Sequence, residues 1–396
     1  MELSYTALEY TLIDGGSSDG SVEIVMIKKK LLLVSPFPQK DSYPHLSNLI
    51  DELSVYYEID YVYVHERGVW IEEILWHLKK NLFRKSAYAP FYNIIKDLIT
   101  LYRMQHNQYD TVLAVDNFIY VMTALIFQKK TILWSHDFVT YDQKKHKSKI
   151  HQFIAKLTKQ ALAKNTKLII QDGERLRTLL RSLEFNDNEM LGKPFFLPVS
   201  LNPAKASRKN HKLLSRIDSN VPTLMQIGGI NSIRSGSDEL IKFYQQNFDD
   251  FELMFHGFVS TEIQKLLREV EILPFVSSVM VPADQISQLV DRCDIGFINY
   301  VTDDLNFYYM ANASGQLVEF IRCGKPVIVK GNNDLRRCVE EKQIGVGISK
   351  VDELVPAIHR IQVNYSDYSS NCRKTFDELY NLKSYMKKLL LYLEDN

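Results

Sequence analysis

The chain has 396 residues, of which 45% are hydrophobic and 24% are charged, so it carries ample apolar material for globular cores. At roughly 100–200 residues per domain, this length predicts two domains or three small ones. The 48 basic and 48 acidic side chains cancel, which argues against a protein that binds nucleic acid through bulk positive charge.

Cysteine spacing and hydropathy indicate the compartment. The four cysteines (Cys293, Cys323, Cys338 and Cys372) form no Cys-x-x-Cys pair, so we expect neither a zinc site nor a disulfide framework. No apolar run reaches about 18 residues, and the first residues lack a basic region followed by an apolar one, so neither a membrane span nor secretion is expected. A cytoplasmic protein fits these features best.

Short apolar runs alternate with helical patterns along almost the whole chain. In chain order, the predicted strands are 30–34, 59–64, 111–115, 131–134, 167–170, 223–227, 251–255, 277–281, 295–298 and 326–329. Strands of this kind, separated by helices, are typical of parallel sheets that are covered on both faces.

A polar and basic stretch divides these strands into two groups. We expect an extension at 1–27, a first domain at 28–201, a linker at 202–220, a second domain at 221–374 and a C-terminal helical segment at 375–396, with a helical pattern over 375–393. The predicted fold class is α/β, with two Rossmann-like βα domains facing across a cleft. Ligands bind such sheets at the carboxyl ends of their strands.

The most informative segment runs from Ala313 to Val329. Ala313, Ser314 and Gly315 form a small-residue turn before a helical run, and free N–H groups at such a helix start favour a phosphate or diphosphate. Glu319 follows just over one turn later, where its carboxylate could accept hydrogen bonds from ribose hydroxyls. The alternative is an ordinary N-cap at Ser314 with a solvated Glu319.

This segment resembles the nucleotide-sugar signature of GT-B glycosyltransferases, and family 4 most closely. The resemblance rests on SGQLVEF at 314–320 and GKPVI at 324–328, and extends in order over most of 30–375. The supporting segments are 132–137, 169–172, 196–199, 224–241, 253–257, 281–286 and 294–298. The resemblance implies the GT-B fold and a glycosyltransferase.

Carried over residue by residue, the resemblance assigns a donor site in the second domain. It implies that Arg234 binds the donor diphosphate, with help from Ser314, Gly315 and Gln316, and that Glu319 holds the ribose. The full donor-binding set is Gly228, Gly229, Arg234, Val281, Ser314, Gly315, Gln316, Leu317 and Glu319. A guanidinium suits this role because it makes planar, multidentate contacts to phosphate oxygens.

Two positions depart from the family pattern. Many members carry a Glu at the place of Ala311, where it contacts the donor sugar, and many carry Arg at the place of Gly229. These departures support an alternative, a non-catalytic GT-B protein that binds nucleotide-sugar or glycan in an assembly complex. A sugar-nucleotide 2-epimerase on the same fold lacks obvious additional acid and base residues.

His136 and Asp137 follow directly on an apolar strand, at the sheet edge where ligands bind. The resemblance implies that His136 contacts the sugar or acceptor, so His136 and Arg234 are the candidate catalytic residues. No metal site and no cofactor are expected, since the nucleotide-sugar is a substrate. Retention of the anomeric configuration is implied by the resemblance alone.

Two further segments complete the prediction. Residues 5–24 resemble the opening of a family 2 (GT-A) glycosyltransferase, and we interpret them as a remnant without a catalytic role. The stretch from Lys144 to Lys167 is rich in lysine and has an apolar stripe at helical spacing. It is either a solvated, packed helix or a peripheral contact with the inner face of the membrane.

Together these features predict a transferase of cell-surface polysaccharide synthesis. Its partners would be a nucleotide-diphosphate sugar and a glycan or lipid-linked acceptor, with no nucleic acid.

Overall fold

A computed structural model describes residues 8–13, 23–38, 43–64, 88–128, 131–136, 149–164, 167–185, 192–204, 220–277, 281–301 and 305–395. Side chains are described for these residues except 8–13, 23–27, 88–95, 149–154 and 305. The chain forms two units. Unit 1 comprises Met1–Lys40, Leu46–Leu197 and Tyr385–Asn396, and unit 2 comprises Asp41–His45 and Pro198–Ser384.

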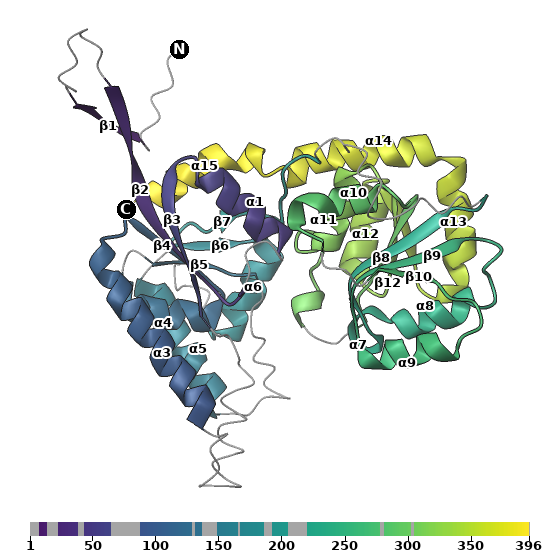
Figure 1. The fold of residues 1–396 in the computed structure, drawn as a ribbon, viewed down its shortest axis with the longest axis horizontal. Coiled ribbons are helices and arrows are strands. Elements are labelled where there is room, and N and C mark those ends of the chain that lie inside the picture. Colours follow the sequence, from purple (N-terminus) through teal and green to yellow (C-terminus); the bar gives the residue numbers. More distant parts are fainter. Residues whose placement is uncertain are drawn as a thin grey trace. The chain divides into compact units, whose positions relative to one another are not determined.

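Unit 1 is built on a sheet that is parallel except for its first strand. Its strands are β1 (Leu8–Ile13), β2 (Glu23–Ser35), β3 (Tyr57–Tyr63), β4 (Thr111–Val115), β5 (Thr131–Trp134), β6 (Leu168–Ile170) and β7 (Phe195–Phe196). From β2 the parallel order runs β2-β4-β5-β6-β7, and β3 pairs with the other side of β2. Every residue of β4, β5 and β6 is buried, because helices cover both faces (Figure 1).

The helices of unit 1 alternate with these strands. They are α1 (Pro44–Leu53), α3 (Tyr88–Met104), α4 (Asn117–Phe127), α5 (Lys149–Lys164) and α6 (Gly173–Ser182). Aliphatic side chains from the strands and from α4, α5 and α6 form one core, which includes Leu32, Val112, Leu133 and Leu179. This alternation is the one that the apolar runs predicted.

The chain start adds an antiparallel hairpin. β1 pairs with the first part of β2, from Leu8 opposite Lys28 to Ile13 opposite Glu23. The remainder of β2, from Lys29 to Ser35, pairs in parallel with β3. The expected domain start at residue 28 therefore lies inside one continuous strand.

Unit 2 contains a six-stranded parallel sheet in the order β10-β9-β8-β11-β12-β13. The strands are β8 (Thr223–Ile230), β9 (Glu252–Val259), β10 (Phe275–Ser277), β11 (Ile295–Asn299), β12 (Val327–Lys330) and β13 (Gly345–Ile348). The order reverses between β8 and β11, which is the topological switch point of a doubly wound Rossmann sheet.

Helices flank this sheet on both faces. They are α7 (Ser232–Ser235), α8 (Ser237–Tyr244), α9 (Thr261–Glu269), α10 (Ile286–Val290), α11 (Gly315–Arg322), α12 (Asn333–Glu341), α13 (Leu354–Val363) and α14 (Tyr365–Thr375), whereas α15 (Lys383–Glu394) lies almost entirely in unit 1. Alternate strand residues serve two separate cores: Met225, Met254 and Ile298 pack in one, and Leu224, Phe255 and Phe297 in the other. The period-two alternation is the direct consequence of strand geometry.

Three expectations differ from the structure. The strand expected at 277–281 is β10, which covers Phe275–Ser277, and Val281 lies beyond it in a loop. The helical pattern over 375–393 is interrupted: a π-helical turn (Phe376–Tyr380) ends at Asn381, whose backbone is extended and pairs with Leu201. β7 and β13 were not predicted, because two-residue and glycine-containing strands give little periodic signal.

The C-terminal helix returns to unit 1. From Tyr385 onward α15 belongs to that unit. The Tyr392 hydroxyl accepts a hydrogen bond from the Leu168 N–H at 2.8 Å and donates one to the Leu168 carbonyl oxygen at 3.1 Å. Lys29 Nζ lies 3.2 Å from Glu394 Oε1. Buried Met386, Leu389, Leu390 and Leu393 form the apolar face of the helix.

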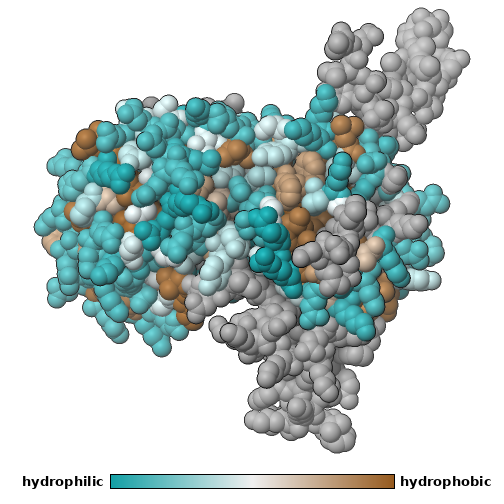
Figure 2. All heavy atoms as spheres, turned by 180° about the vertical axis from the view of Figure 1, so that it is seen from behind, coloured by the Kyte–Doolittle hydropathy of each residue, from teal (hydrophilic) through white to brown (hydrophobic). Residues whose placement is uncertain are grey.

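Among the helices that the structure describes, none combines the length and the apolar character needed to cross a bilayer. The face shown in Figure 2 is largely hydrophilic, and its hydrophobic residues form small separate patches.

Candidate functional site

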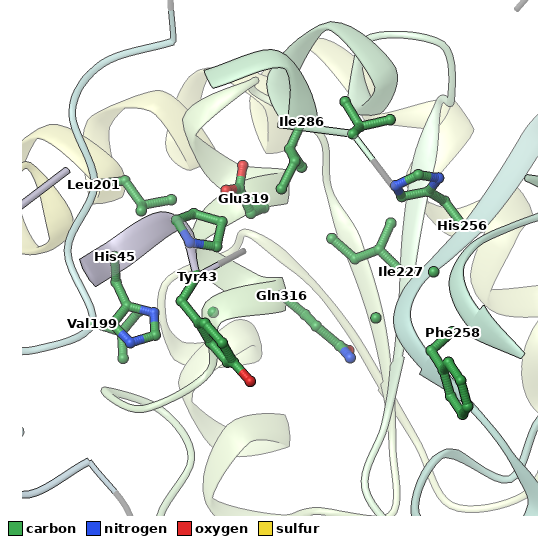
Figure 3. Close-up of a pocket in the computed structure, with 15 residues that line it drawn as sticks. Tyr43, His45, Val199, Leu201, Ile227, His256, Phe258, Ile286, Gln316 and Glu319 are labelled. Carbon is green, nitrogen blue, oxygen red and sulfur yellow. The ribbon is translucent and has the colours of Figure 1, made fainter. Parts of the chain in front are cut away.

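A cavity of about 410 Å³ lies in unit 2 beside the carboxyl ends of β8 and β9. Gly228, close to the end of β8, and Gly257, close to the end of β9, form part of its wall, and Gly315, Gln316 and Glu319 of α11 form another part. The remaining lining residues are mostly apolar: Tyr43, Pro44, His45, Val199, Leu201, Ile227, His256, Phe258, Val281 and Ile286 (Figure 3). An apolar cavity with a few polar groups at the carboxyl ends of parallel strands is typical of a ligand site.

The N-cap at Ser314 fixes the start of helix α11, and the first two helical residues, Gly315 and Gln316, line the cavity. Ser314 has an extended backbone, and its Oγ accepts from the Leu317 N–H at 3.1 Å. The Tyr300 hydroxyl lies 2.9 Å from the same Oγ. Ser314 and Leu317 are fully buried, so both serve the cap and the core and neither lines the cavity.

Glu319 lies in the second turn of α11 and lines the cavity. Only 4% of the residue is exposed, so the alternative interpretation of Glu319 as a solvated residue is wrong. Its Oε2 lies 2.6 Å from Arg322 Nη2 as an ion pair, whereas Oε1 has no hydrogen-bond partner. Leu317, Val318, Phe320 and Ile321 of the same helix are buried as well.

Burial raises the pKa of Glu319 from its ordinary 4.5 to about 7, although the positive charge of Arg322 opposes the rise. The ionised carboxylate only accepts hydrogen bonds, and hydroxyl groups of a ligand that donate to it would stabilise its charged form.

Because the Glu319 pKa is raised, the free energy of unfolding should decrease as the pH rises from 4.5 to 7. Between pH 4.5 and 7 the folded protein keeps the Glu319 proton while the unfolded chain releases it, so folding stability falls as the pH rises through this window and is constant above it. At about 1.4 kcal/mol per pKa unit, wild type should lose about 3 kcal/mol relative to Glu319→Gln. Urea unfolding of both proteins at pH 5 and pH 8 measures this difference, and a constant difference contradicts it.

Gln316 fills the space that a glycine leaves open. A Cβ at Gly228 would lie 3.0 Å from Gln316 Nε2, so the amide reaches the end of β8. Gln316 Oε1 is buried without a hydrogen-bond partner. Gln316 Oε1 and Glu319 Oε1 are therefore buried acceptors without hydrogen bonds, on two residues that line the cavity.

His256 and Phe258 line the cavity from β9, and sequence reasoning missed both. The His256 ring places Nδ1 3.2 Å from Ser277 Oγ, and burial lowers the His256 pKa. Phe258 is 78% exposed. The rule that selected His136, a polar or aromatic residue at the carboxyl end of a strand, could have selected these two as well.

Arg234 belongs to the short helix α7 and is exposed. Its backbone N–H donates to Asn231 Oδ1 at 2.7 Å, and its carbonyl accepts from the Val301 N–H at 2.8 Å. The guanidinium carbon lies 5.8 Å from the centre of the Phe307 ring. Arg234 and Gly229 are outside the cavity lining.

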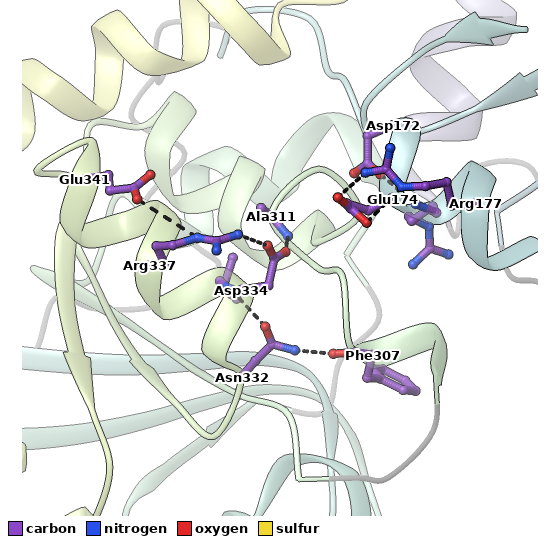
Figure 4. A network of polar contacts seen from close by, with 11 residues as sticks. Asp172, Glu174, Arg177, Phe307, Ala311, Asn332, Asp334, Arg337 and Glu341 are labelled. Carbon is purple, nitrogen blue, oxygen red and sulfur yellow. Dashed lines mark hydrogen bonds and ion pairs between the residues drawn. The ribbon is translucent and has the colours of Figure 1, made fainter.

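A polar network holds the segment before α11 in place (Figure 4). Asp334 Oδ2 accepts from the Ala311 N–H at 2.9 Å, and Ala311 O accepts from the Tyr380 hydroxyl at 2.8 Å. Asn332 caps α12 and also donates to Phe307 O. Ala311 therefore has a methyl side chain and a backbone whose N–H and carbonyl are both hydrogen-bonded.

Comparisons with known proteins decide the fold. Residues 242–393 match the family model described as "Glucosyltransferase 3-like, C-terminal domain". The structure of Anabaena Alr3699/HepE in complex with UDP-glucose is similar with a TM-score of 0.65 at 14% identity, covering 93% of this chain and 100% of that one.

Two more solved structures are similar to this chain over most of its length. The E. coli protein described as trehalose-6-phosphate bound with UDP-2-fluoro glucose has a TM-score of 0.65 at 10% identity, covering 93% and 99% of the two chains. WaaG, a glycosyltransferase involved in lipopolysaccharide biosynthesis, has a TM-score of 0.58 at 14% identity, covering 92% and 100%.

The chain has the GT-B fold. The prediction of this fold and of the resemblance to GT-B glycosyltransferases is confirmed. No curated protein sequence matches the chain significantly.

Five of the residues predicted to bind the nucleotide-sugar lie around one cavity. Gly228, Val281, Gly315, Gln316 and Glu319 line the cavity. Among the side chains that the structure describes, no group of three or more His, Cys, Asp or Glu residues could hold a metal ion.

His136 lies in unit 1, two residues after the end of β5. Its N–H donates to Asp116 Oδ1 at 2.9 Å, and its carbonyl accepts from Arg175 Nη2 and from Gln171 Nε2. The Trp134 and His136 rings lie 4.2 Å apart. Three side chains thus fix the His136 backbone at the carboxyl edge of the sheet, while Asp137 lies outside the described residues.

The lysine-rich segment is described only in part. Lys144, Lys145 and Lys147 lie outside the described residues, and Lys156 and Lys164 are exposed. Lys159 donates to Glu184 O and lies 5.1 Å from the Phe185 ring centre, and Lys167 donates to Tyr392 O at 2.8 Å. Two of its lysines therefore make contacts within unit 1, and membrane contact stays a prediction.

Proposed function

We propose that the chain is a glycosyltransferase that moves a sugar from a nucleotide-diphosphate sugar to a glycan or lipid-linked acceptor in cell-surface polysaccharide synthesis. In this proposal the reaction retains the anomeric configuration and needs no metal ion. The observation that carries it is the buried Glu319 carboxylate on the cavity lining: Oε2 pairs with Arg322, and Oε1 has no hydrogen-bond partner. The GT-B fold and the glucosyltransferase 3-like match over 242–393 support the same reaction class.

Each part of a nucleotide-sugar has a matching group in the proposal. The ribose hydroxyls would donate to Glu319, and the apolar side chains of Ile227, Val281 and Ile286 would enclose the base. The N-terminus of α11 at Gly315 suits the diphosphate, because its N–H groups and dipole favour negative charge. A Cβ at Gly315 would meet nothing within 4 Å, so the backbone is open to a close ligand.

Arg234 and His136 complete the proposal as the catalytic residues. Arg234 is an exposed guanidinium beside Phe307, and it would stabilise charge that grows on the leaving diphosphate. His136 would contact the sugar or acceptor. Three further residues remain proposed donor-binding residues. Gly229 would act through its backbone at the end of β8, and Ser314 and Leu317 would act through the N-cap of α11.

The direct test replaces the carboxylate. Glu319→Gln keeps the size of the side chain but loses its charge, so we expect the affinity for UDP or another nucleoside diphosphate to fall about 10- to 100-fold. This range corresponds to hydrogen bonds to a charged group, at about 1.5–3 kcal/mol. Calorimetric titration above pH 7.5 measures it, because Glu319 is then mostly ionised.

Glu269→Gln is the matched control. Glu269 is exposed at the end of α9 in the same unit, and its replacement should leave nucleotide affinity unchanged. Equal affinities of wild type and Glu319→Gln would remove Glu319 from the site.

Donor turnover separates the enzyme from the second candidate, a non-catalytic protein that binds nucleotide-sugar or glycan. Ala311 favours this second function, because no carboxylate side chain is available at the position where many relatives contact the donor sugar. Hydrolysis or transfer across a panel of UDP-, GDP- and ADP-sugars in the presence of a chelator supports the transferase. Tight binding without turnover supports the binding protein.

A further inference from the structure

Arg322 is buried one helical turn after Glu319, and no part of the site described so far uses it. Its side chain and that of Glu319 are each 5% exposed, and Arg322 Nη2 lies 2.6 Å from Glu319 Oε2. A second nitrogen of the same guanidinium, Nη1, donates to Asn202 O at 3.3 Å. Arg322 is thus held between the carboxylate and the backbone of the segment that enters unit 2.

A buried arginine is costly and cannot lose its proton, so its position has a definite electrostatic effect. The positive charge beside Glu319 favours the ionised carboxylate against a burial that disfavours it. The ion pair engages Oε2 and leaves Oε1 without a hydrogen-bond partner. The carboxylate therefore keeps its charge, with Oε1 and the second lone pair of Oε2 left to accept from a ligand.

We infer that Arg322 is a positioning residue for the nucleotide: it keeps Glu319 ionised and held at the cavity wall, so that the carboxylate can accept hydrogen bonds from both ribose hydroxyls. This inference rests on the proposed function. Arg322 acts through Glu319 and does not line the cavity itself.

Other charged and titratable groups near α11 do not replace Arg322. His45 and His256 line the same cavity, but burial lowers the pKa of both, that of His45 to about 4, so they are neutral above pH 7. The remaining groups on the helix ends and on neighbouring elements are Cys323, Asp291, Lys325, Arg373, Asp377 and Glu378. Among all of these, Arg322 is the charge that acts on the Glu319 pKa.

The experiment compares two nucleotides that differ only in the hydroxyls that Glu319 would bind. Affinities for UDP and for 2′,3′-dideoxy-UDP are measured by calorimetry on the full chain at pH 6.5, 7.5 and 9. In wild type, UDP should bind more tightly than dideoxy-UDP, and the ratio should rise with pH. In Arg322→Met the Glu319 carboxyl stays protonated at pH 7.5, so the ratio should fall about tenfold while dideoxy-UDP binding is unchanged.

Three variants make the result specific. Arg322→Lys keeps the charge and should keep most of the wild-type ratio, and Arg322→Gln replaces the methionine variant if circular dichroism shows that the latter is unfolded. Arg337→Met is the matched control, because Arg337 also pairs three residues back, with Asp334 at 3.2 Å, but is exposed on α12 (Figure 4). It should leave both affinities unchanged.

The outcomes separate the two proposals. A wild-type ratio in Arg322→Met, or an equal loss for both nucleotides, overturns the positioning role, since a merely structural arginine would not distinguish the two sugars. Failure of wild type to bind any nucleotide in the donor panel overturns the proposed function instead.

Discussion

Replacing Gly257 with alanine is expected to lower the free energy of unfolding by about 4 kcal/mol, as the sum of backbone strain and overpacking at about 1–3 kcal/mol each. Gly257 has φ +137°, and a Cβ there would lie 1.9 Å from Gly228 O on the neighbouring strand. Because Gly228 and Gly257 are paired residues of β8 and β9, the two strands must separate where they form the cavity wall. Urea unfolding and nucleotide titration should both register the change.

Gly173→Ala is the control for this prediction. A Cβ at Gly173 would meet nothing within 4 Å, and the residue is the first of α6, so its replacement should be neutral or stabilise by about 0.5–1 kcal/mol. A Gly257→Ala protein with wild-type stability would show that the end of β9 yields without cost.

Arg175→Met is expected to destabilise unit 1 by about 4 kcal/mol, because two acceptors lose their donor at about 1–3 kcal/mol each. Arg175 is 1% exposed, and its Nε donates to Gln171 Oε1 at 2.8 Å while Nη2 donates to His136 O. The substitution therefore releases the backbone of the candidate catalytic histidine. Urea unfolding measures the loss, and hydrogen exchange around 131–136 locates it.

Arg177→Met tests whether any arginine of α6 has this effect. Arg177 pairs with Glu174 at the surface, where both side chains are at least half exposed, so its loss should cost less than about 1 kcal/mol. Similar losses in the two variants would contradict a special role for the buried guanidinium.

Three independent measurements test the role of the Glu319 carboxylate. Glu319→Gln tests the site, the pH dependence of stability tests the burial of the carboxylate, and Arg322→Met tests how its charge is maintained. Each uses a different measurement, so agreement among them would not follow from a single property of the chain.

The sequence by itself determined the fold class and the position of α11. Buried parallel strands are continuous apolar runs, so 111–115 and 131–134 could be predicted to the residue. The N-cap at Ser314 was equally predictable, because an extended serine before a helix satisfies the third N–H with its own side chain. These features depend on neighbours in the sequence, and local rules therefore apply to them.

Only the tertiary structure decided which of the predicted residues share a site. Glu319 and Arg322 differ by one turn on a helix that sequence alone allows to be solvated, and burial by the sheet and the flanking helices turned them into an ion pair with a raised carboxyl pKa. His256 joined the cavity through strand pairing, and the helix expected over 375–393 was broken where Asn381 pairs with Leu201. Desolvation and pairing between distant segments are properties of the folded chain, and no local pattern encodes them.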